Sequence, residues 1–457
     1  MAILSTGGLH ASEADIHLPP LQDVSFFNGS VSGSAILFIG LAICAIGALF
    51  GILQYQKIRA LPVHKTMSDV SHTIWETCKT YLWQQGKFLA ALWGIIAVCM
   101  VYYFGELQHK TFANVSIILA SSVLGILGSY GVAWFGIRIN TIANSRTAFS
   151  ALKGNVIKTL FIPLRSGMSI GSLLVCVELF FMICILTFLP RELTGPCFIG
   201  FAIGESLGAA ALRIGGGIFT KIADIGSDLM KIVFKLPEDD PKNPGVIADC
   251  TGDNAGDSVG PTADGFETYG VTGVALIAFL ALALAANPLV CATLIVWLFA
   301  MRALMIVTSL VSYFINSAIV HAKYAHRKEF DLEAPLTELV WMTSIISIIT
   351  TFVASYFLLA HQAALNPSLW WILSAIISCG TLAGALIPEF TRIFTSTNSK
   401  HVREITACSK RGGASLNILS GFVAGNFSAF WTGFVILTLM FAALLLSKNA
   451  AMISLMP

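Results

Sequence analysis

Long apolar stretches separated by short polar segments dominate the chain. Ten of these stretches are long enough to cross a bilayer, because a membrane-spanning helix needs about 20 predominantly apolar residues. They cover residues 33–53, 88–104, 113–137, 167–189, 197–233, 247–285, 289–316, 336–359, 369–390 and 414–446. The pattern predicts an all-α, polytopic membrane protein with about 10 transmembrane helices.

The positions of lysine and arginine predict the orientation of these helices. Basic residues gather in four segments that fall on one side if ten spans alternate, at 57–79, 138–165, 323–328 and 392–411. Such segments face the cytoplasm, so both termini are expected outside, in a multi-pass protein of the bacterial inner or cell membrane. The expected organisation is an extracytoplasmic segment, a single helical transmembrane domain and a C-terminal tail, at residues 1–32, 33–447 and 448–457.

Composition agrees with a membrane protein and excludes some other classes. Of the 457 residues, 56% are hydrophobic and only 11% are charged, against about 25% charged in an ordinary soluble domain. The net charge of +2 comes with no basic run, so we expect no nucleic-acid partner. The ten cysteines include no CxxC pair and are expected to be small buried hydrophobes. The N-terminal segment has no signal-peptide pattern.

The stretch from Arg213 to Glu267 departs from this apolar pattern. Ten of the 25 acidic residues fall between Asp224 and Glu267. A charge at the centre of a membrane costs about 2.5–3.5 kcal/mol on insertion scales. Charged residues in such a stretch are therefore candidates for function.

The spacing of these charges predicts two facing polar stripes. At about 100° per residue, one stripe of a helix collects Asp249, Asp253, Asp257, Asp264 and Glu267. The preceding helix collects Arg213, Lys221, Asp224, Asp228 and Lys231. So many carboxylates repel one another as bare anions, whereas Mg²⁺ with phosphate oxygens would neutralise them. The lysines suit phosphate oxygens.

A few other polar residues fall within predicted spans. Glu178 and Glu205 are either buried structural acids or part of a pump path, and Arg302 is expected to pack against backbone carbonyls or an acid. Asp239 and Asp240 fit a solvated turn as well as they fit a binding site.

The acidic stretch also carries a recognisable signature. The segments GGGIFTKIADIGSDL, LPEDDPKNPGVIADCTGDNAGD and ADGFE resemble the signature of the membrane-integral pyrophosphatases, which are cation pumps energised by pyrophosphate. RINTIANSRTAFSALKGNVIKTLFIPLRSG and HVREITACSKRGGASLNILSGFVAG resemble further segments of that family. The resemblance implies an inorganic diphosphatase and cation translocase that hydrolyses magnesium pyrophosphate at a cytosolic site and exports Na⁺ and/or H⁺. It also implies a homodimer and leaves K⁺ dependence open.

The resemblance assigns roles to individual residues. The positions that match the holders of magnesium pyrophosphate are Lys221, Asp224, Asp228, Glu238, Asp249, Asp253 and Asp257. Of these, Asp257, Lys221 and Asp253 are implied in catalysis, with Asp257 activating the attacking water. The implied magnesium ligands are Asp224, Asp228, Asp249, Asp253 and Asp257. Arg213, Asp264 and Glu267 match an ion gate, and Glu267 stands at a position typical of sodium-pumping members.

The chain also departs from the family pattern. Cys250 and Thr251, and the run from Ser258 to Pro261, differ from the usual residues. The later motifs DAYGP…DNAGG and GDxxGDPxKDTSGP are absent, and Asp331 is the only aspartate after Asp264. We therefore expect the C-terminal third of the family's roughly sixteen helices to be missing, together with the determinant of K⁺ dependence.

Three interpretations follow. In the first, a second polypeptide supplies the missing helices of a pump. In the second, the chain is a truncated, inactive remnant. In the third, it is a passive membrane protein that binds or transports divalent cations with the acidic stripe alone.

Overall fold

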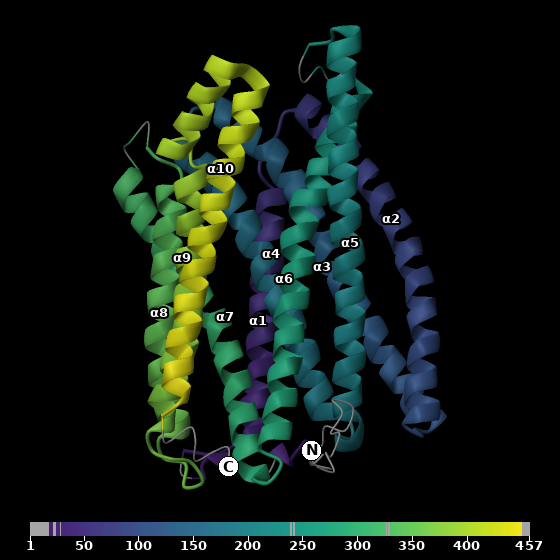
Figure 1. Ribbon diagram of the computed structural model, residues 1–457, viewed down its shortest axis with the longest axis vertical. Coiled ribbons are helices and arrows are strands. Elements are labelled where there is room, and N and C mark those ends of the chain that lie inside the picture. The colour runs from purple at the N-terminus through teal and green to yellow at the C-terminus, as the bar shows by residue number, and fades with distance from the viewer. Residues whose placement is uncertain are drawn as a thin grey trace, which may run out of the picture. The chain divides into compact units, whose positions relative to one another are not determined.

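In the residues that it describes, the structure, a computed structural model, consists of helices, the loops that connect them and two very short strands (Figure 1). It describes residues 18–449 except 22, 23, 28, 238, 239, 241, 242, 326, 328 and 329, and it leaves out the side chain of residue 257. The elements are β1 Ser25–Phe26, β2 Val31–Ser32, α1 Gly33–Arg59, α2 Lys65–Val101, the π-helix η3 Tyr102–Leu107, α3 Phe112–Leu152, α4 Val156–Phe188, α5 Arg191–Phe234, α6 Pro244–Ala283, α7 Pro288–Tyr324, α8 Ala334–Leu359, α9 Leu369–Thr395 and α10 Lys400–Ser447.

Within this described part, nine stretches are long and apolar enough to cross a membrane. The last of the nine runs through both α9 and α10. Each of the ten predicted spans is helical to within two residues of its ends, and the span at 88–104 continues from α2 into η3. The prediction of an all-α, polytopic membrane protein is confirmed. The sidedness of the termini and the division into a single transmembrane domain with flanking segments stay predictions.

Side-chain caps mark the starts of several helices. The Asn155 side chain accepts a hydrogen bond from the backbone N–H of Lys158 at 3.0 Å, at the start of α4. Asn243 accepts one from the N–H of Gly245 at 2.9 Å, and Pro244 occupies the first turn of α6. Such caps satisfy N–H groups that the first helical turn leaves without partners. The signals at 243–244 therefore start α6 just before its acidic stretch.

The observed helices extend beyond the apolar stretches. α2 begins at Lys65 and so includes a polar stretch before the apolar residues 88–104, and α3 continues to Leu152. Polar residues such as Lys, Gln and Glu form helices as readily as most apolar ones, so hydropathy finds the span and not the helix end. α10 is broken at Gly413, whose φ of 58° is a backbone conformation that glycine adopts readily.

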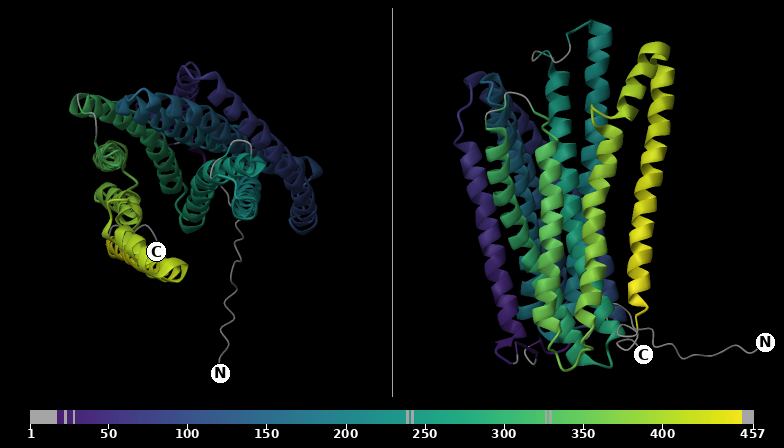
Figure 2. Two further views of the ribbon diagram at one scale, coloured as in Figure 1. Left: turned by 90° about the horizontal axis from the view of Figure 1, so that it is seen from above. Right: turned by 90° about the vertical axis from the view of Figure 1, so that its left-hand side faces the viewer.

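The chain divides into two compact units. Unit 1 comprises residues 1–24, 32–306 and 327–329. Within it α5 packs along α6 and α3, and α1 packs along α4, as Figures 1 and 2 show. A buried core cluster from α2, α3, α5 and α6 joins Trp75, Cys78, Leu82, Ala133, Ile137, Ala209, Leu212, Val259 and Ala263. α5 and α6 are thus held on one side by α2 and α3.

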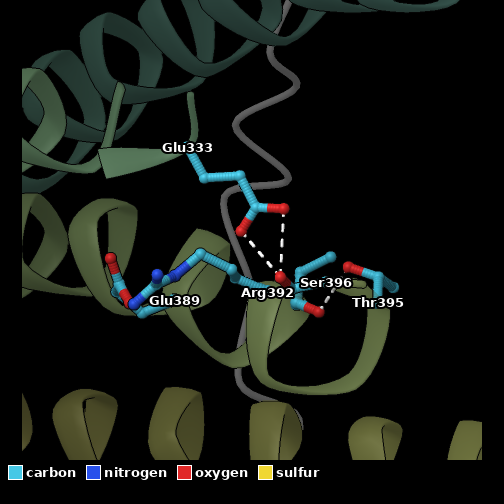
Figure 3. Close-up of polar contacts among 6 residues, drawn as sticks. Glu333, Glu389, Arg392, Thr395 and Ser396 are labelled. Carbon is cyan, nitrogen blue, oxygen red and sulfur yellow. Dashed lines mark hydrogen bonds and ion pairs between the residues drawn. The ribbon is translucent and has the colours of Figure 1, made fainter. Parts of the chain in front are cut away.

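Unit 2 comprises residues 25–31, 307–326 and 330–457. Here α9 packs against α8 and α10. Glu333, the N-cap residue of α8, accepts hydrogen bonds from the Ser396 hydroxyl at 2.8 and 3.0 Å (Figure 3). Ser396 caps the C-terminus of α9, so the start of α8 is tied to the end of α9. Lys323 forms an ion pair with Glu338 and joins α7 to α8 in the same way.

Candidate functional site

A close contact between α5 and α6 centres on Thr220. Its hydroxyl donates a 2.6 Å hydrogen bond across the interface to the carbonyl of Gly252. A Cβ added at Gly252 would lie 2.8 Å from the Cα of Thr220, and one at Gly256 would lie 2.6 Å from its hydroxyl oxygen. Small residues permit such close contact between membrane helices. Lys221 and Asp253, each one residue further along its helix, therefore flank this contact.

The predicted substrate residues lie near the adjoining ends of α5 and α6. Lys221, Asp228 and Asp253 are exposed, whereas Asp224 and Asp249 are half-buried. The Lys231 ammonium lies 3.2 Å from the Asp228 carboxylate, one turn apart on α5. The remaining members of the predicted set, Glu238 and the side chain of Asp257, lie outside the described residues.

These carboxylates do not form a closed metal cage. In the described part of the chain, no three acidic, histidine or cysteine side chains come together as a metal-binding group. Mg²⁺, however, usually takes one or two carboxylates and completes its shell with water and substrate phosphates. The donor set here consists of carboxylate oxygens on exposed or half-buried side chains, and it fits Mg²⁺ that arrives with a phosphate ligand.

Two of the three predicted gate residues are in contact. Arg213 of α5 forms an ion pair with Asp264 of α6, and each side chain is about half exposed, at 48% and 46%. Glu267, one turn after Asp264, is half-buried and interacts electrostatically with Glu205 of α5. A half-exposed pair of this kind contributes only about 0–1 kcal/mol to stability, so it can break and re-form at low cost.

A second set of polar contacts, which the sequence analysis did not single out, holds α6 against α3. The Asn140 amide donates to the Ser258 hydroxyl at 2.8 Å and accepts from the Ser166 hydroxyl of α4 at 2.7 Å. The Asn144 amide donates to Asn254 at 3.3 Å. Asn140 and Asn144 are four residues apart and so share one face of α3. That spacing was a usable sequence signal, and the pair positions the part of α6 that carries the acids.

Deeper in unit 1, α4 to α7 bring charged groups together. Glu178 of α4 and Glu205 of α5 are fully buried, and the exposed fraction of Arg302 of α7 is 8%. The Arg302 guanidinium donates to the carbonyl of Tyr269 at 2.8 Å and to the Thr272 hydroxyl at 3.4 Å, and it lies 4.2 Å from the centre of the Tyr269 ring. The expectation that Arg302 packs against a backbone carbonyl is confirmed.

Comparison with known proteins adds a family and several relatives. The family model for the inorganic H⁺ pyrophosphatase matches residues 45–455. A protein from Chlorobaculum tepidum, named a K(+)-insensitive pyrophosphate-energized proton pump, is 62% identical over 88% of this chain and 54% of its own length. A protein of the same name from Pyrobaculum aerophilum is 30% identical over 86% of this chain and 52% of its own length.

A more distant relative carries a different name. The protein from Bacteroides thetaiotaomicron, named a putative K(+)-stimulated pyrophosphate-energized sodium pump, is 26% identical over 79% of this chain and 49% of its own length. The chain spans about half the length of the curated relatives it matches.

Proposed function

The chain belongs to the inorganic H⁺ pyrophosphatase family, and from this premise we propose that it provides the α5–α6 part of a pyrophosphate-energised cation pump. In this role it binds magnesium pyrophosphate at the adjoining ends of α5 and α6 and couples hydrolysis to export of a cation. The observation that supports the proposal is the contact between Thr220 and Gly252, because Lys221 and Asp253 of the signature directly follow these two residues in the sequence.

Each residue has a chemical task in this proposal. The Lys221 ammonium is a compact charge suited to phosphate oxygens. The half-buried or exposed carboxylates that would hold magnesium are Asp224, Asp228, Asp249 and Asp253. Magnesium supplies neutralisation of the negative charge on the pyrophosphate. Asp257 takes the proton of the water that attacks phosphorus, so no side chain needs to act as a covalent nucleophile.

Coupling between hydrolysis and transport would run along α6. Residues 257 and 267 are separated by about 15 Å on a helix, at about 1.5 Å per residue. The Arg213–Asp264 pair lies between them and joins α6 to α5. A small displacement of α6 on hydrolysis would break this pair and open Asp264 and Glu267 to a cation. A low-cost, half-exposed pair suits such a gate.

The transported cation in this proposal is H⁺ or Na⁺. The relative from Chlorobaculum tepidum is named a proton pump and the one from Bacteroides thetaiotaomicron a sodium pump, and Glu267 provides a carboxylate that suits either ion. We further propose that K⁺ is not required, following the name of the more similar relative. The working assembly is a homodimer in the lipid bilayer, with a second chain supplying helices that complete each site.

The test compares the chain alone with a complemented form. The purified chain in lipid vesicles is assayed for binding of magnesium pyrophosphate by calorimetry, for phosphate release, and for ²²Na⁺ or proton uptake. The same assays follow co-expression with the part of the Chlorobaculum tepidum relative that lies outside the matched region. We expect the chain alone to bind magnesium pyrophosphate. We expect hydrolysis and cation uptake in the co-expressed form, if not already in the chain alone.

The outcomes separate the three interpretations. Neither binding nor hydrolysis in either form would overturn the proposal and leave an inactive remnant. Magnesium or magnesium pyrophosphate binding without turnover in either form would also overturn it and favour a passive cation-binding protein. Hydrolysis without any cation uptake would support the proposed enzymatic activity and refute the proposed pumping.

A further inference from the structure

Two glutamates are buried in the membrane part of unit 1 without visible compensation. Glu178 and Glu205 each have 0% of their surface exposed. None of their four carboxyl oxygens has a hydrogen-bond partner among the described residues outside this pair, and the two carboxyls lie close enough to share a hydrogen bond if one of them is protonated. An unpartnered buried polar group costs about 1–3 kcal/mol, and a charged one costs more. Among the described side chains, no group outside the pair therefore satisfies these oxygens.

Both carboxyls face the same point beside Gly270 of α6. A Cβ added at Gly270 would overlap an oxygen of Glu178 and an oxygen of Glu205, and it would lie 2.5 Å from the other oxygen of Glu205. The two carboxyls are therefore neighbours across α4, α5 and α6. Only glycine leaves this point open to them.

The charges around this point do not balance. Arg302 interacts electrostatically with both glutamates. Its hydrogen bonds in the described structure, however, go to Tyr269, Thr272 and the sulfur of Met182. Taken by themselves, one guanidinium and the two buried carboxylates leave one negative charge uncompensated, and the half-buried Glu267 adds to it. In a medium of low dielectric constant, one further positive charge is needed.

We propose that Glu178 and Glu205 together bind one monovalent cation, either a proton shared by the two carboxyls or a sodium ion held by their oxygens. The Tyr269 hydroxyl is a candidate third oxygen, because it is buried without a described hydrogen-bond partner and interacts electrostatically with Glu178. Carboxylate and hydroxyl oxygens suit a hard cation such as Na⁺, and a single positive charge neutralises the set formed by Glu178, Glu205 and Arg302.

The position of this site gives it a role in export. Gly270 follows Asp264 by six residues, which is about 9 Å along the helix, on the side away from the acids of the proposed substrate site. Glu267 lies between them in sequence and interacts with Glu205. The site would thus receive a cation after it passes the Arg213–Asp264 pair. This role in export rests on the proposed function, whereas the binding of a cation does not.

Other groups face this region from every helix packed around it. From α3, the Ser129 hydroxyl donates a 3.0 Å hydrogen bond to the backbone carbonyl of Glu205. The titratable and charged neighbours are Cys44 of α1, Cys176 of α4, Glu267 and Tyr269 of α6, and Arg302 of α7. Arg302 is the one cation in this set.

The experiment measures cation binding directly, on the full chain in lipid nanodiscs and without pyrophosphate. Infrared difference spectra record the C=O stretching band of protonated carboxyls while pH or Na⁺ concentration is changed, and ²²Na⁺ binding is measured in parallel. A proton site gives a band that disappears as pH rises and ignores Na⁺. A sodium site gives a band that disappears on adding Na⁺ at constant pH, with one ²²Na⁺ bound per chain.

Four variants tie the signal to the two glutamates. Glu178→Gln and Glu205→Gln should each abolish the titrating band or the bound ²²Na⁺. Glu192→Gln, which alters an exposed glutamate on α5, should leave both readouts unchanged. Gly270→Ala keeps both charges but fills the shared point, so it should weaken Na⁺ binding at least about tenfold, or shift the pH midpoint of the band.

A matched glycine variant controls for helix effects. A Cβ at Gly260, also on α6, meets nothing within 4 Å, so Gly260→Ala should behave as the unaltered protein. Thermal unfolding of each variant shows whether it is folded. If a glutamine variant does not fold, Gly270→Ala provides the test in its place. The proposal is overturned if folded protein shows no cation-dependent carboxyl band and no ²²Na⁺ binding. It is equally overturned if the signals survive in both folded glutamine variants. Pyrophosphate turnover plays no part in either outcome.

Discussion

The two halves of the α5–α6 pair place the same kind of side chain in opposite surroundings. Near the adjoining helix ends, Lys221 and Asp253 are exposed beside a close helix contact. Further along, Glu205 is fully buried and faces Glu178 beside Gly270. Exposed carboxylates can remain ionised because water solvates them, so they can bind a metal ion together with an anionic substrate. Buried carboxyls must be neutralised by a proton or by a bound cation, so they can bind a cation that is moving through the membrane.

The ion pair of Arg213 and Asp264 separates the two halves. It is half exposed and crosses from α5 to α6, whereas the contacts on either side are close packing at Thr220 and buried charge at Glu205. This arrangement predicts that changes at the exposed half affect hydrolysis, changes in the packing affect stability, and changes at the ion pair affect coupling.

The largest effect is expected from removing a carboxylate of the exposed half. Asp253→Asn should lower pyrophosphate hydrolysis by about 100-fold or more, because a charged ligand of the substrate complex is lost. Phosphate release by the complemented protein measures this. Asp69→Asn, at an exposed aspartate of α2, is the control and should retain activity. If Asp253→Asn hydrolyses pyrophosphate normally, the exposed half is not the substrate site.

The close contact of α5 and α6 should come next. Gly252→Ala places a Cβ against the backbone of Thr220, and such overpacking should lower the free energy of unfolding by about 1–3 kcal/mol. Thermal unfolding in lipid nanodiscs measures the change as a lower Tm. A Cβ at Gly226 of α5 meets nothing within 4 Å, so Gly226→Ala should have the same Tm as the unaltered protein. Equal Tm values for the two variants would show that the helices are not held by this contact.

A smaller effect is expected at the polar contacts with α3. Asn140→Ala removes hydrogen bonds to both Ser258 and Ser166 and should cost about 1 kcal/mol, since interhelical hydrogen bonds in membranes contribute about 0.6 kcal/mol on average. Asn144→Ala removes a single, longer bond to Asn254 and should cost less. Tm values order the two variants, and a larger loss for Asn144→Ala would contradict the proposed positioning of α6 by Asn140.

The smallest stability effect should come from the ion pair itself. Arg213→Gln should change the free energy of unfolding by less than about 1 kcal/mol, because a half-exposed pair contributes little. The number of cations taken up per pyrophosphate hydrolysed should nevertheless fall, because Asp264 loses its partner. Parallel assays of uptake and phosphate release in vesicles measure this ratio. If uptake and hydrolysis fall by the same factor, Arg213 belongs to catalysis and not to the gate.

Sequence periodicity predicted the helices well and their ends poorly. Each apolar span coincides with observed helix to within two residues, but α2 and α3 extend well beyond the apolar positions, because a helix continues wherever its backbone bonds and side chains allow. The ion pair of Arg213 and Asp264 joins the two predicted polar stripes. A regular helix fixes which residues share a face, but it was the family resemblance that implied these two as partners.

The contacts between distant helices were not accessible in the same way. Asn140 and Ser258 are 118 positions apart in the sequence, and neither segment contains a pattern that predicts this contact. Glu178 and Glu205 could be recognised as unusual residues within spans. Their meeting at Gly270 depends on how three helices cross.

The sequence alone thus determined that this is a helical membrane protein, because about 20 apolar residues in a row satisfy their backbone within one helix and partition into lipid wherever they occur. It also determined which acids are candidates for binding magnesium pyrophosphate. Only the tertiary structure decided which carboxyl groups are exposed and which are buried. Burial is a property of neighbouring helices, and their packing depends on contacts between residues far apart in the chain.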